Sequence, residues 1–172
     1  MENLKKYITE INDFPKEGIV FKDLNPIYQE PKIWNQIMLP LEKLINRAKP
    51  DYIAAIESRG FIAGSALAYK KEIGFIPIRK PDKLPGKLFG VNYKLEYGED
   101  RLEIQDGLLT KKSTIIIIDD LLATGGTASA AGNLIKEAGG TLIGYGFLVE
   151  LTELKGRTKL DTNLIIDSVL KY

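Results

Sequence analysis

Four consecutive isoleucines at residues 115–118, preceded by Ser113 and Thr114, constrain the fold of this chain more than any other feature. Such a β-branched run favours a strand. Because apolar and polar residues do not alternate along it, the run is typical of a strand covered on both faces, as in the centre of a parallel sheet. The rest of the chain must therefore provide helices for both faces of that sheet.

The remaining sequence supplies alternating strand and helix patterns. Apolar runs predict strands over 52–56, 74–78 and 142–149, and an edge strand over 164–169. Helical spacing predicts helices over 2–11, 31–47, 61–71 and 127–138. This order predicts an α/β fold with a mostly parallel twisted sheet flanked by helices, and a site at the carboxyl ends of the strands.

Length and missing residue types narrow the chemistry. A chain of 172 residues suits one ordinary domain, so we treat 1–172 as a single domain. The sequence has no cysteine and no histidine, which excludes thiol nucleophiles, imidazole bases and zinc sites built from these residues. Chemistry must come from carboxylates, cations, hydroxyls and backbone amides.

The charge balance argues against large anionic partners. The formal net charge is +1, from 24 Lys and Arg against 23 Asp and Glu, so no overall field attracts nucleic acid or a membrane surface. The first residues lack the apolar core of a signal peptide, and no stretch approaches the ~20 apolar residues that span a bilayer. We expect a cytoplasmic protein with no nucleic-acid or membrane partner.

The isoleucine strand leads into the segment 115–127, IIIIDDLLATGGT. It predicts that Asp119 and Asp120 reach the edge of the sheet, ahead of a small-residue loop and a helix. The unpaired N–H groups and dipole of a helix start favour an anion, and Gly125 and Gly126 let the backbone approach a phosphate. Because carboxylates accept hydrogen bonds from hydroxyls, a ribose 5-phosphate suits both halves of the segment.

Two other phosphate-binding patterns are absent. No lysine follows the glycines as in a Walker A loop, and the GxGxxG of dinucleotide-binding folds is missing after the strand. An ordinary acidic loop and turn before a helix is the remaining alternative, and it would better explain an isolated Asp-Asp or Gly-Gly pair. The ordered run of strand, acids, glycines and helix favours a ligand site.

Several segments resemble the type I phosphoribosyltransferases. The segment 115–127 resembles their motif for phosphoribosyl pyrophosphate (PRPP), in the DDLLATGGT form typical of adenine-specific members. Further segments agree in order and spacing and together cover most of the chain: FPKEGIVFKDLNPI at 14–27, ESRGF at 57–61, RKPDKLPG at 79–86, YKLEYG and LEIQ within 93–105, and VELTELKGRTKL at 149–160. The resemblance implies the type I fold, with an N-terminal helix and base-binding hood over 1–30 and a mobile active-site loop within 79–101.

The resemblance also implies roles for single residues. The 5-phosphate is expected at the backbone of Ala123, Thr124, Gly125, Gly126 and Thr127, and the ribose hydroxyls at Asp119 and Asp120. Pyrophosphate is expected to bind Ser58, Arg59, Arg79, Lys83 and Tyr97. Adenine is expected to lie against Phe14, Ile19 and Val20, with Arg59 nearby. Glu96 is the expected catalytic residue for the purine proton, because the chain has no histidine.

Some of these roles have alternatives. Any one basic residue at 79–83 can belong to a solvated charged surface. Asp82 stands where the family usually has glycine, and its carboxylate would repel pyrophosphate unless it points away, so we favour Arg79 and Lys83 over Lys80. The hood side chains can equally be core, and Glu96 can be a strand residue facing water.

The implied reaction transfers the phosphoribosyl group of PRPP to N9 of adenine and gives AMP and pyrophosphate. Mg²⁺ is the expected cofactor, bound mainly through pyrophosphate oxygens and water, without a dedicated metal site in the protein. The resemblance also implies a homodimer. Two alternatives are a phosphoribosyltransferase for another nucleobase and a regulatory protein that senses PRPP.

Overall fold

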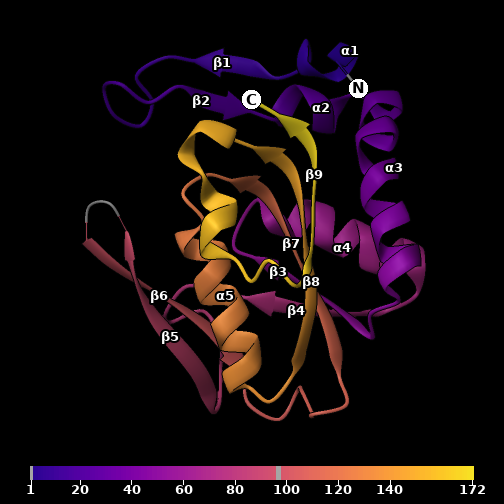
Figure 1. Ribbon diagram of the computed structural model, residues 1–172, viewed down its shortest axis with the longest axis vertical. Coiled ribbons are helices and arrows are strands. Elements are labelled where there is room, and N and C mark those ends of the chain that lie inside the picture. Colours follow the sequence, from indigo (N-terminus) through magenta and orange to yellow (C-terminus); the bar gives the residue numbers. More distant parts are fainter. Residues whose placement is uncertain (1, 96–97) are drawn as a thin grey trace.

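The structure, a computed structural model, describes residues 2–95 and 98–172 (Figure 1). The isoleucine run lies in β7 (Thr114–Leu122), the middle strand of a five-stranded sheet with the order β4-β3-β7-β8-β9. All neighbouring strands are parallel, and the others are β3 (Tyr52–Ile56), β4 (Gly74–Ile78), β8 (Thr141–Glu150) and β9 (Ile165–Lys171). The predicted α/β class and the edge position of the last strand are confirmed.

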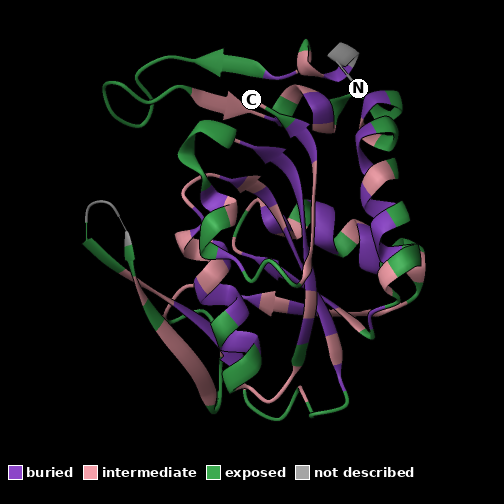
Figure 2. Ribbon diagram, viewed as in Figure 1, coloured by how far each residue is buried: buried purple, intermediate pink, exposed green. Residues whose placement is uncertain are grey.

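Helices cover both faces of the sheet, as the isoleucine run requires. α3 (Pro31–Ala48) and α4 (Gly60–Lys71) lie on one face, and α5 (Gly126–Glu137) lies on the other (Figure 1). Ile116 and Ile118 pack with side chains of α3 and α4, whereas Ile115 and Ile117 pack with those of α5. Alternate isoleucines therefore fill two separate buried cores. Figure 2 shows buried residues along the sheet and along the helices that cover it.

The N-terminal segment differs from the sequence-based prediction. Only α1 (Glu2–Lys5) is helical within 2–11, and β1 (Thr9–Ile11) pairs antiparallel with β2 (Phe21–Asp23). The predicted helix is wrong beyond Lys5, because the chain turns at residues 6–8. Ile11 is 40% exposed and does not extend the apolar face of Leu4 and Ile8. A short helix, α2 (Asn25–Gln29), then leads into α3.

A β-hairpin occupies much of the region that we expected to be a long loop. β5 (Leu88–Leu95) and β6 (Gly98–Gln105) pair antiparallel and project beside α5 (Figure 1). Leu102 and Ile104 are fully buried and anchor the hairpin in the core on the α5 side of the sheet. Two 3₁₀ helices, η1 (Thr152–Leu154) and η2 (Gly156–Lys159), connect β8 to β9.

Within 2–95 and 98–172, no helix is both long and apolar enough to cross a bilayer.

Candidate active site

A cavity of about 460 Å³ opens where β3 and β7, neighbours at the centre of the sheet, reach their carboxyl ends. Its walls come from the turn after β3, from the end of β7 with the loop that follows, and from the first turn of α5. Phe21 of β2 and Lys80, which follows β4, complete the lining. Parallel α/β sheets bind their ligands at this edge.

The loop between β7 and α5 is shaped to receive an anion. Gly125 has a φ of 80°, a backbone angle that residues with a side chain rarely adopt. A Cβ added to Gly125 would collide with the Gly156 carbonyl. A Cβ on Gly156 would in turn collide with the Ala123 carbonyl. No side chain in the described part of the chain caps α5. The amides of its first turn therefore remain available to an anion, with the positive end of the helix dipole behind them.

An ion pair holds the segment that packs against this loop. Arg157 donates 2.8 Å hydrogen bonds from Nε and Nη2 to the two carboxylate oxygens of Glu150, and its Nη1 donates to the Ile166 carbonyl. Burial would raise the pKa of Glu150, but the hydrogen bonds from Arg157 and Ser168, together with the positive charges of Arg157 and Lys171, outweigh it and lower that pKa. The pair therefore stays ionised and joins η2 to β8, which fixes Gly156 against the anion loop.

Asp119 and Asp120 lie at the end of β7 and line the cavity. Asp120 is 5% exposed, and the Arg59 Nε lies 2.7 Å from its Oδ2. Burial and repulsion from Asp120 raise the pKa of Asp119, and burial also raises the pKa of Asp120 although Arg59 acts against it. This acidic pair, only partly compensated by Arg59, can accept hydrogen bonds from the two hydroxyls of a diol.

Arg59 connects the aspartates to the N-terminal segment. It follows β3 in a turn that contains a cis Glu57–Ser58 peptide, and Ser58 also lines the cavity. The Arg59 guanidinium carbon lies 4.8 Å from the ring centre of Phe21, and the Phe14 ring contacts Phe21 edge-on at 5.1 Å. One guanidinium thus contacts both the acidic pair and the aromatic side of the cavity.

The predicted hood residues lie at the rim rather than in the lining. Phe14, Ile19 and Val20 are 51%, 42% and 43% exposed, and of this segment only Phe21 lines the cavity. These exposed apolar side chains leave an apolar surface beside the acidic pair, where a flat aromatic ligand can be covered.

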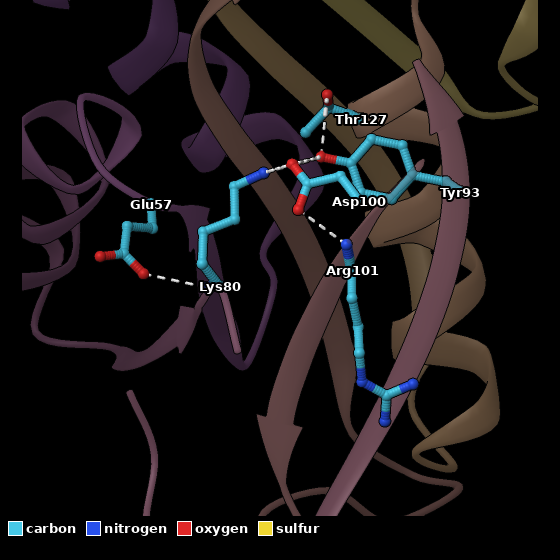
Figure 3. A network of polar contacts seen from close by, with 6 residues as sticks. All are labelled: Glu57, Lys80, Tyr93, Asp100, Arg101 and Thr127. Atoms are coloured by element: carbon cyan, nitrogen blue, oxygen red, sulfur yellow. Dashed lines mark hydrogen bonds and ion pairs between the residues drawn. The ribbon is translucent and has the colours of Figure 1, made fainter. Parts of the chain in front are cut away.

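The basic residues after β4 take different directions. The Arg79 Nη2 lies 3.0 Å from a carboxylate oxygen of Glu57, and Lys83 is exposed. Lys80 lines the cavity, and its ammonium contacts the Tyr93 hydroxyl and the Asp100 carboxylate of the hairpin (Figure 3). Within one chain, the structure therefore brings Lys80 to the cavity rather than the two residues that the sequence favoured.

The backbone conformation at Asp82 is one that usually favours glycine. Its φ is 62°, in the left-handed region that glycine adopts most easily and that aspartate tolerates better than most residues. Its side chain is exposed and is not part of the cavity lining. The other two predicted site residues of this region, Glu96 and Tyr97, lie outside the described residues.

Comparison with known proteins identifies the family of this chain. Residues 23–167 match the model of the phosphoribosyl transferase domain. The chain belongs to the phosphoribosyltransferase family. A relative from Prochlorococcus marinus (strain NATL2A), named adenine phosphoribosyltransferase, is 72% identical over 172 residues, with 100% of both chains covered.

Two solved structures extend the comparison. Adenine phosphoribosyltransferase from Thermoanaerobacter pseudethanolicus is 46% identical with a TM-score of 0.95, and the match covers 99% of both chains. The Saccharomyces cerevisiae enzyme, complexed with adenine and an imino-altritol bisphosphate, is 41% identical with a TM-score of 0.90, covering 98% of this chain and 97% of that one. The whole chain therefore has the phosphoribosyltransferase fold.

Several residues that shape this phosphoribosyltransferase cavity were not singled out from the sequence. A Cβ on Gly60 would lie 2.6 Å from Asp119 Oδ1, and the signal was a glycine placed directly after Arg59 where a helix begins. Gly156 carried a similar signal within 149–160. Asp100 carried none, because a single acid in a polar strand has no distinctive pattern.

In the part of the chain that the structure describes, no group of three or more acidic side chains is placed to hold a metal ion. Asp119 and Asp120 are the carboxylates that β7 presents to the cavity. They are oxygen ligands of the kind that Mg²⁺ prefers.

Proposed function

We propose that this chain transfers the phosphoribosyl group of PRPP to N9 of adenine, giving AMP and pyrophosphate, as a purine-salvage enzyme. One observation carries the proposal. A helix-start anion loop and the Asp119–Asp120 pair share a single cavity, as the phosphate and diol of one ribose 5-phosphate require. The names of the relatives favour adenine as the base, and the yeast relative has been crystallised with adenine.

The ribose 5-phosphate half of PRPP is assigned to the segment after β7. Its phosphate accepts hydrogen bonds from the backbone of 123–127 and from the hydroxyls of Thr124 and Thr127, and its diol donates to Asp119 and Asp120. The assignment is supported by the positive φ of Gly125 and by the raised pKa values of both aspartates. A diol that donates hydrogen bonds stabilises the ionised form of these carboxylates.

The pyrophosphate of PRPP is assigned to the turn after β3 and to the basic segment. Ser58 and Arg59 are proposed to contact the pyrophosphate from the turn after β3. Lys80, which lines the cavity, is added as a proposed pyrophosphate ligand to the predicted residues Arg79, Lys83 and Tyr97. Because Lys83 is exposed and Arg79 is not in the cavity lining, we propose that these two act across a homodimer. Light scattering of the purified protein tests this, with a dimer mass expected.

Adenine is assigned to the hood, residues 1–30. Phe14, Ile19 and Val20 are exposed at the rim, next to the Phe21 ring that lies over Arg59. An aromatic base placed here removes apolar surface from water. Backbone groups near residues 19 and 20 are the proposed source of hydrogen bonds to the adenine edge.

Mg²⁺ is the proposed cofactor. It would be held mainly by pyrophosphate oxygens and water, and Asp119 and Asp120 are the carboxylates of β7 that would be available to its hydration shell. When bound, it neutralises charge that develops on the leaving pyrophosphate. The acidic pair fits a hydrated cation because both carboxyls line the cavity.

The protein's own residues position the reactants. The bond from C1 of ribose to the pyrophosphate oxygen breaks, N9 of adenine bonds to C1 from the opposite face, and the purine proton passes to Glu96. In this assignment Asp119 and Asp120 contact the ribose, where positive charge develops, and stabilise that charge electrostatically. Holding both substrates in one cavity supplies much of the rate by orientation.

A labelled-base assay with PRPP and Mg²⁺ tests the function. Adenine is expected to yield AMP, with kcat/KM at least about 100-fold above that for hypoxanthine or guanine, because a site that hydrogen-bonds one base edge leaves polar groups unpaired with another. Preference for another base would assign the chain to a different phosphoribosyltransferase. PRPP binding without AMP formation would instead favour the sensor. We also propose a cytoplasmic location, which fractionation of the cells tests.

A further inference from the structure

Basic side chains at or beside the cavity are each paired with a carboxylate of the same chain. The pairs are Arg59–Asp120, Arg79–Glu57 and Lys80–Asp100. Asp120 and Glu57 line the cavity themselves, whereas Asp100 does not. Lys80 is therefore the cavity cation whose partner lies outside the cavity.

The hairpin holds the Lys80 ammonium through two residues that face each other across its strands. Tyr93 and Asp100 are paired in register between β5 and β6. The Lys80 Nζ donates to the Tyr93 hydroxyl at 2.9 Å and to Asp100 Oδ2, while the Tyr93 hydroxyl donates to the same oxygen at 3.1 Å (Figure 3). The Arg101 amide donates to the other Asp100 oxygen at 2.7 Å. Both carboxylate oxygens are therefore used.

The Lys80–Asp100 pair is ionised and half-buried. The side chains are 34% and 25% exposed. Burial would lower the pKa of Lys80 and raise that of Asp100. The hydrogen bonds and the charge attraction around the pair together outweigh burial, so the pKa of Lys80 is raised and that of Asp100 is lowered. At neutral pH, an anion that enters the cavity therefore meets an ammonium whose charge is already compensated.

We propose that Asp100 is an internal competitor for the pyrophosphate of PRPP, occupying Lys80 in the free protein and giving it up when the ligand binds. This inference rests on the proposed function. A diphosphate carries several negative charges against one on Asp100, so it attracts the ammonium more strongly at equal distance. Because Asp100 lies outside the cavity lining, exchange lets Lys80 turn to the ligand while the carboxylate stays behind.

Tyr93 also links this exchange to the loop assigned to the 5-phosphate. The Tyr93 hydroxyl also accepts a long hydrogen bond from Thr127 Oγ1, at 3.5 Å (Figure 3). The hairpin thus holds one donor from each of the two phosphate positions assigned above, Lys80 for the pyrophosphate and Thr127 for the 5-phosphate. PRPP must draw both donors away from Tyr93 and Asp100.

The direction in which one substitution changes the KM for PRPP tests the proposal. Asp100→Asn keeps the shape and the acceptor for the Arg101 amide but removes the charge, so the KM for PRPP and the Kd for Mg-pyrophosphate should both fall about three- to fivefold, with kcat within about twofold. Glu99→Gln is the matched control. It removes the same charge one residue away on an exposed side chain, and both constants should stay unchanged.

Further variants separate the possible outcomes. In a Lys80→Met background, Asp100→Asn should no longer change either constant, because the competition acts through that ammonium. Tyr93→Phe, which keeps the carboxylate and loses one acceptor, should lower the KM for PRPP by a smaller factor and serves if Asp100→Asn fails to fold. A rise in the PRPP KM would show that Asp100 positions Lys80 for the ligand, and unchanged constants would show no competition, so either result overturns the inference.

The pyrophosphate titration separates this inference from the proposed function. Normal AMP formation and pyrophosphate binding with no response to Asp100→Asn would reject the competition alone. A wild-type protein that binds neither PRPP nor pyrophosphate would reject the proposed function and the inference with it.

Discussion

Asp119 lies beside the buried Asp120, and burial and repulsion between them raise its pKa. A carboxyl with a higher pKa in the folded chain than in the unfolded chain binds more protons when folded. Its contribution to the free energy of unfolding is fully present below the unfolded pKa and is lost as the pH rises through the raised folded value. At neutral pH, the Asp119 carboxyl therefore destabilises the fold. The same carboxyl supplies an acceptor for a ribose hydroxyl.

Replacing Asp119 by asparagine should separate these two effects. Asp119→Asn keeps an oxygen that can accept from the Asp120 amide but removes the repulsion, so the free energy of unfolding at pH 7 should rise by about 1 kcal/mol. The gain should vanish below about pH 4, where the carboxyl is protonated in both states. Urea unfolding at both pH values measures this.

Activity should move in the opposite direction in the same variant. Loss of a charged acceptor for the ribose diol should lower kcat/KM roughly 10- to 100-fold. A less stable variant at pH 7, or a stabilisation that persists at low pH, would refute the electrostatic explanation.

At the residue scale, the sequence indicates which side chains come together where they are contiguous in the chain. Asp119, Asp120 and the loop 123–127 are contiguous and follow a strand of distinctive composition, and all of them line one cavity. The Lys80–Asp100 pair joins residues 20 positions apart across a hairpin, and neither residue differs in pattern from a surface charge. Periodicity has no signal for such a pair, because it arises only when β5 and β6 have paired.

At the scale of elements, α5 is bounded by two glycines with similar backbones and different surroundings. Gly125 and Gly139 have φ values of 80° and 87°. An added Cβ on Gly125 would collide with the Gly156 carbonyl, while nothing lies within 4 Å of one on Gly139. Alanine at either position meets the same backbone strain, of order 1 kcal/mol, but only one displaces the anion loop.

Gly125→Ala should therefore raise the KM for PRPP by at least about tenfold, through displaced amides that each contribute a charge-assisted hydrogen bond. Gly139→Ala should lower the melting temperature to a comparable extent and leave that KM unchanged. Steady-state kinetics and thermal melts of both variants measure this. Equal losses of activity would mean that backbone strain, rather than the contact with Gly156, governs the loop.

The segment between β5 and β6 is predicted to carry the acid–base residue. Glu96→Gln keeps the size of the side chain but cannot accept the purine proton, so kcat should fall roughly 100-fold, within the usual range for a general base. The Kd for AMP should change less than about threefold, because the variant retains hydrogen-bonding capacity. Single-turnover rates and AMP titration measure the two quantities. Near-normal turnover would remove Glu96 from the mechanism.

Element-scale prediction depends on how strongly burial marks the sequence. The strand at 115–118 is fully buried and could be predicted, because both of its faces meet helices. All three residues of β1 are exposed, so burial leaves no mark on their sequence. The outer part of β5 alternates between half-buried and exposed residues at 91–94, which is a short and weak strand pattern within a segment rich in Lys, Gly and Pro. Strand pairing between distant residues decides their conformation, as the register of Ile11 with Phe21 illustrates.

At the scale of the whole molecule, Tyr172 connects β9 to the hood, and the two chain ends lie on the same side of the molecule (Figure 1). The Tyr172 ring lies 4.6 Å from the Lys5 Nζ and 4.3 Å from the Lys22 Nζ. Lys22 also forms an ion pair with Glu10 of β1. Since neighbouring strand residues point to opposite faces, β2 is held through Lys22 on one face and through Phe21 on the other.

Loss of the Tyr172 ring should therefore weaken adenine binding from a distance. Tyr172→Leu removes both cation–π contacts, which at such sites correspond to about 0.5–1 kcal/mol each, so the KM for adenine should rise about three- to tenfold. The KM for PRPP should change less than about twofold, because the anion loop after β7 is braced by Arg157 and Glu150 rather than by the hood. Tyr172→Phe keeps the ring and should behave as wild type. A parallel rise in both KM values for Tyr172→Leu, or an adenine KM that Tyr172→Phe fails to preserve, would mean that the ring stabilises the fold generally or acts through its hydroxyl.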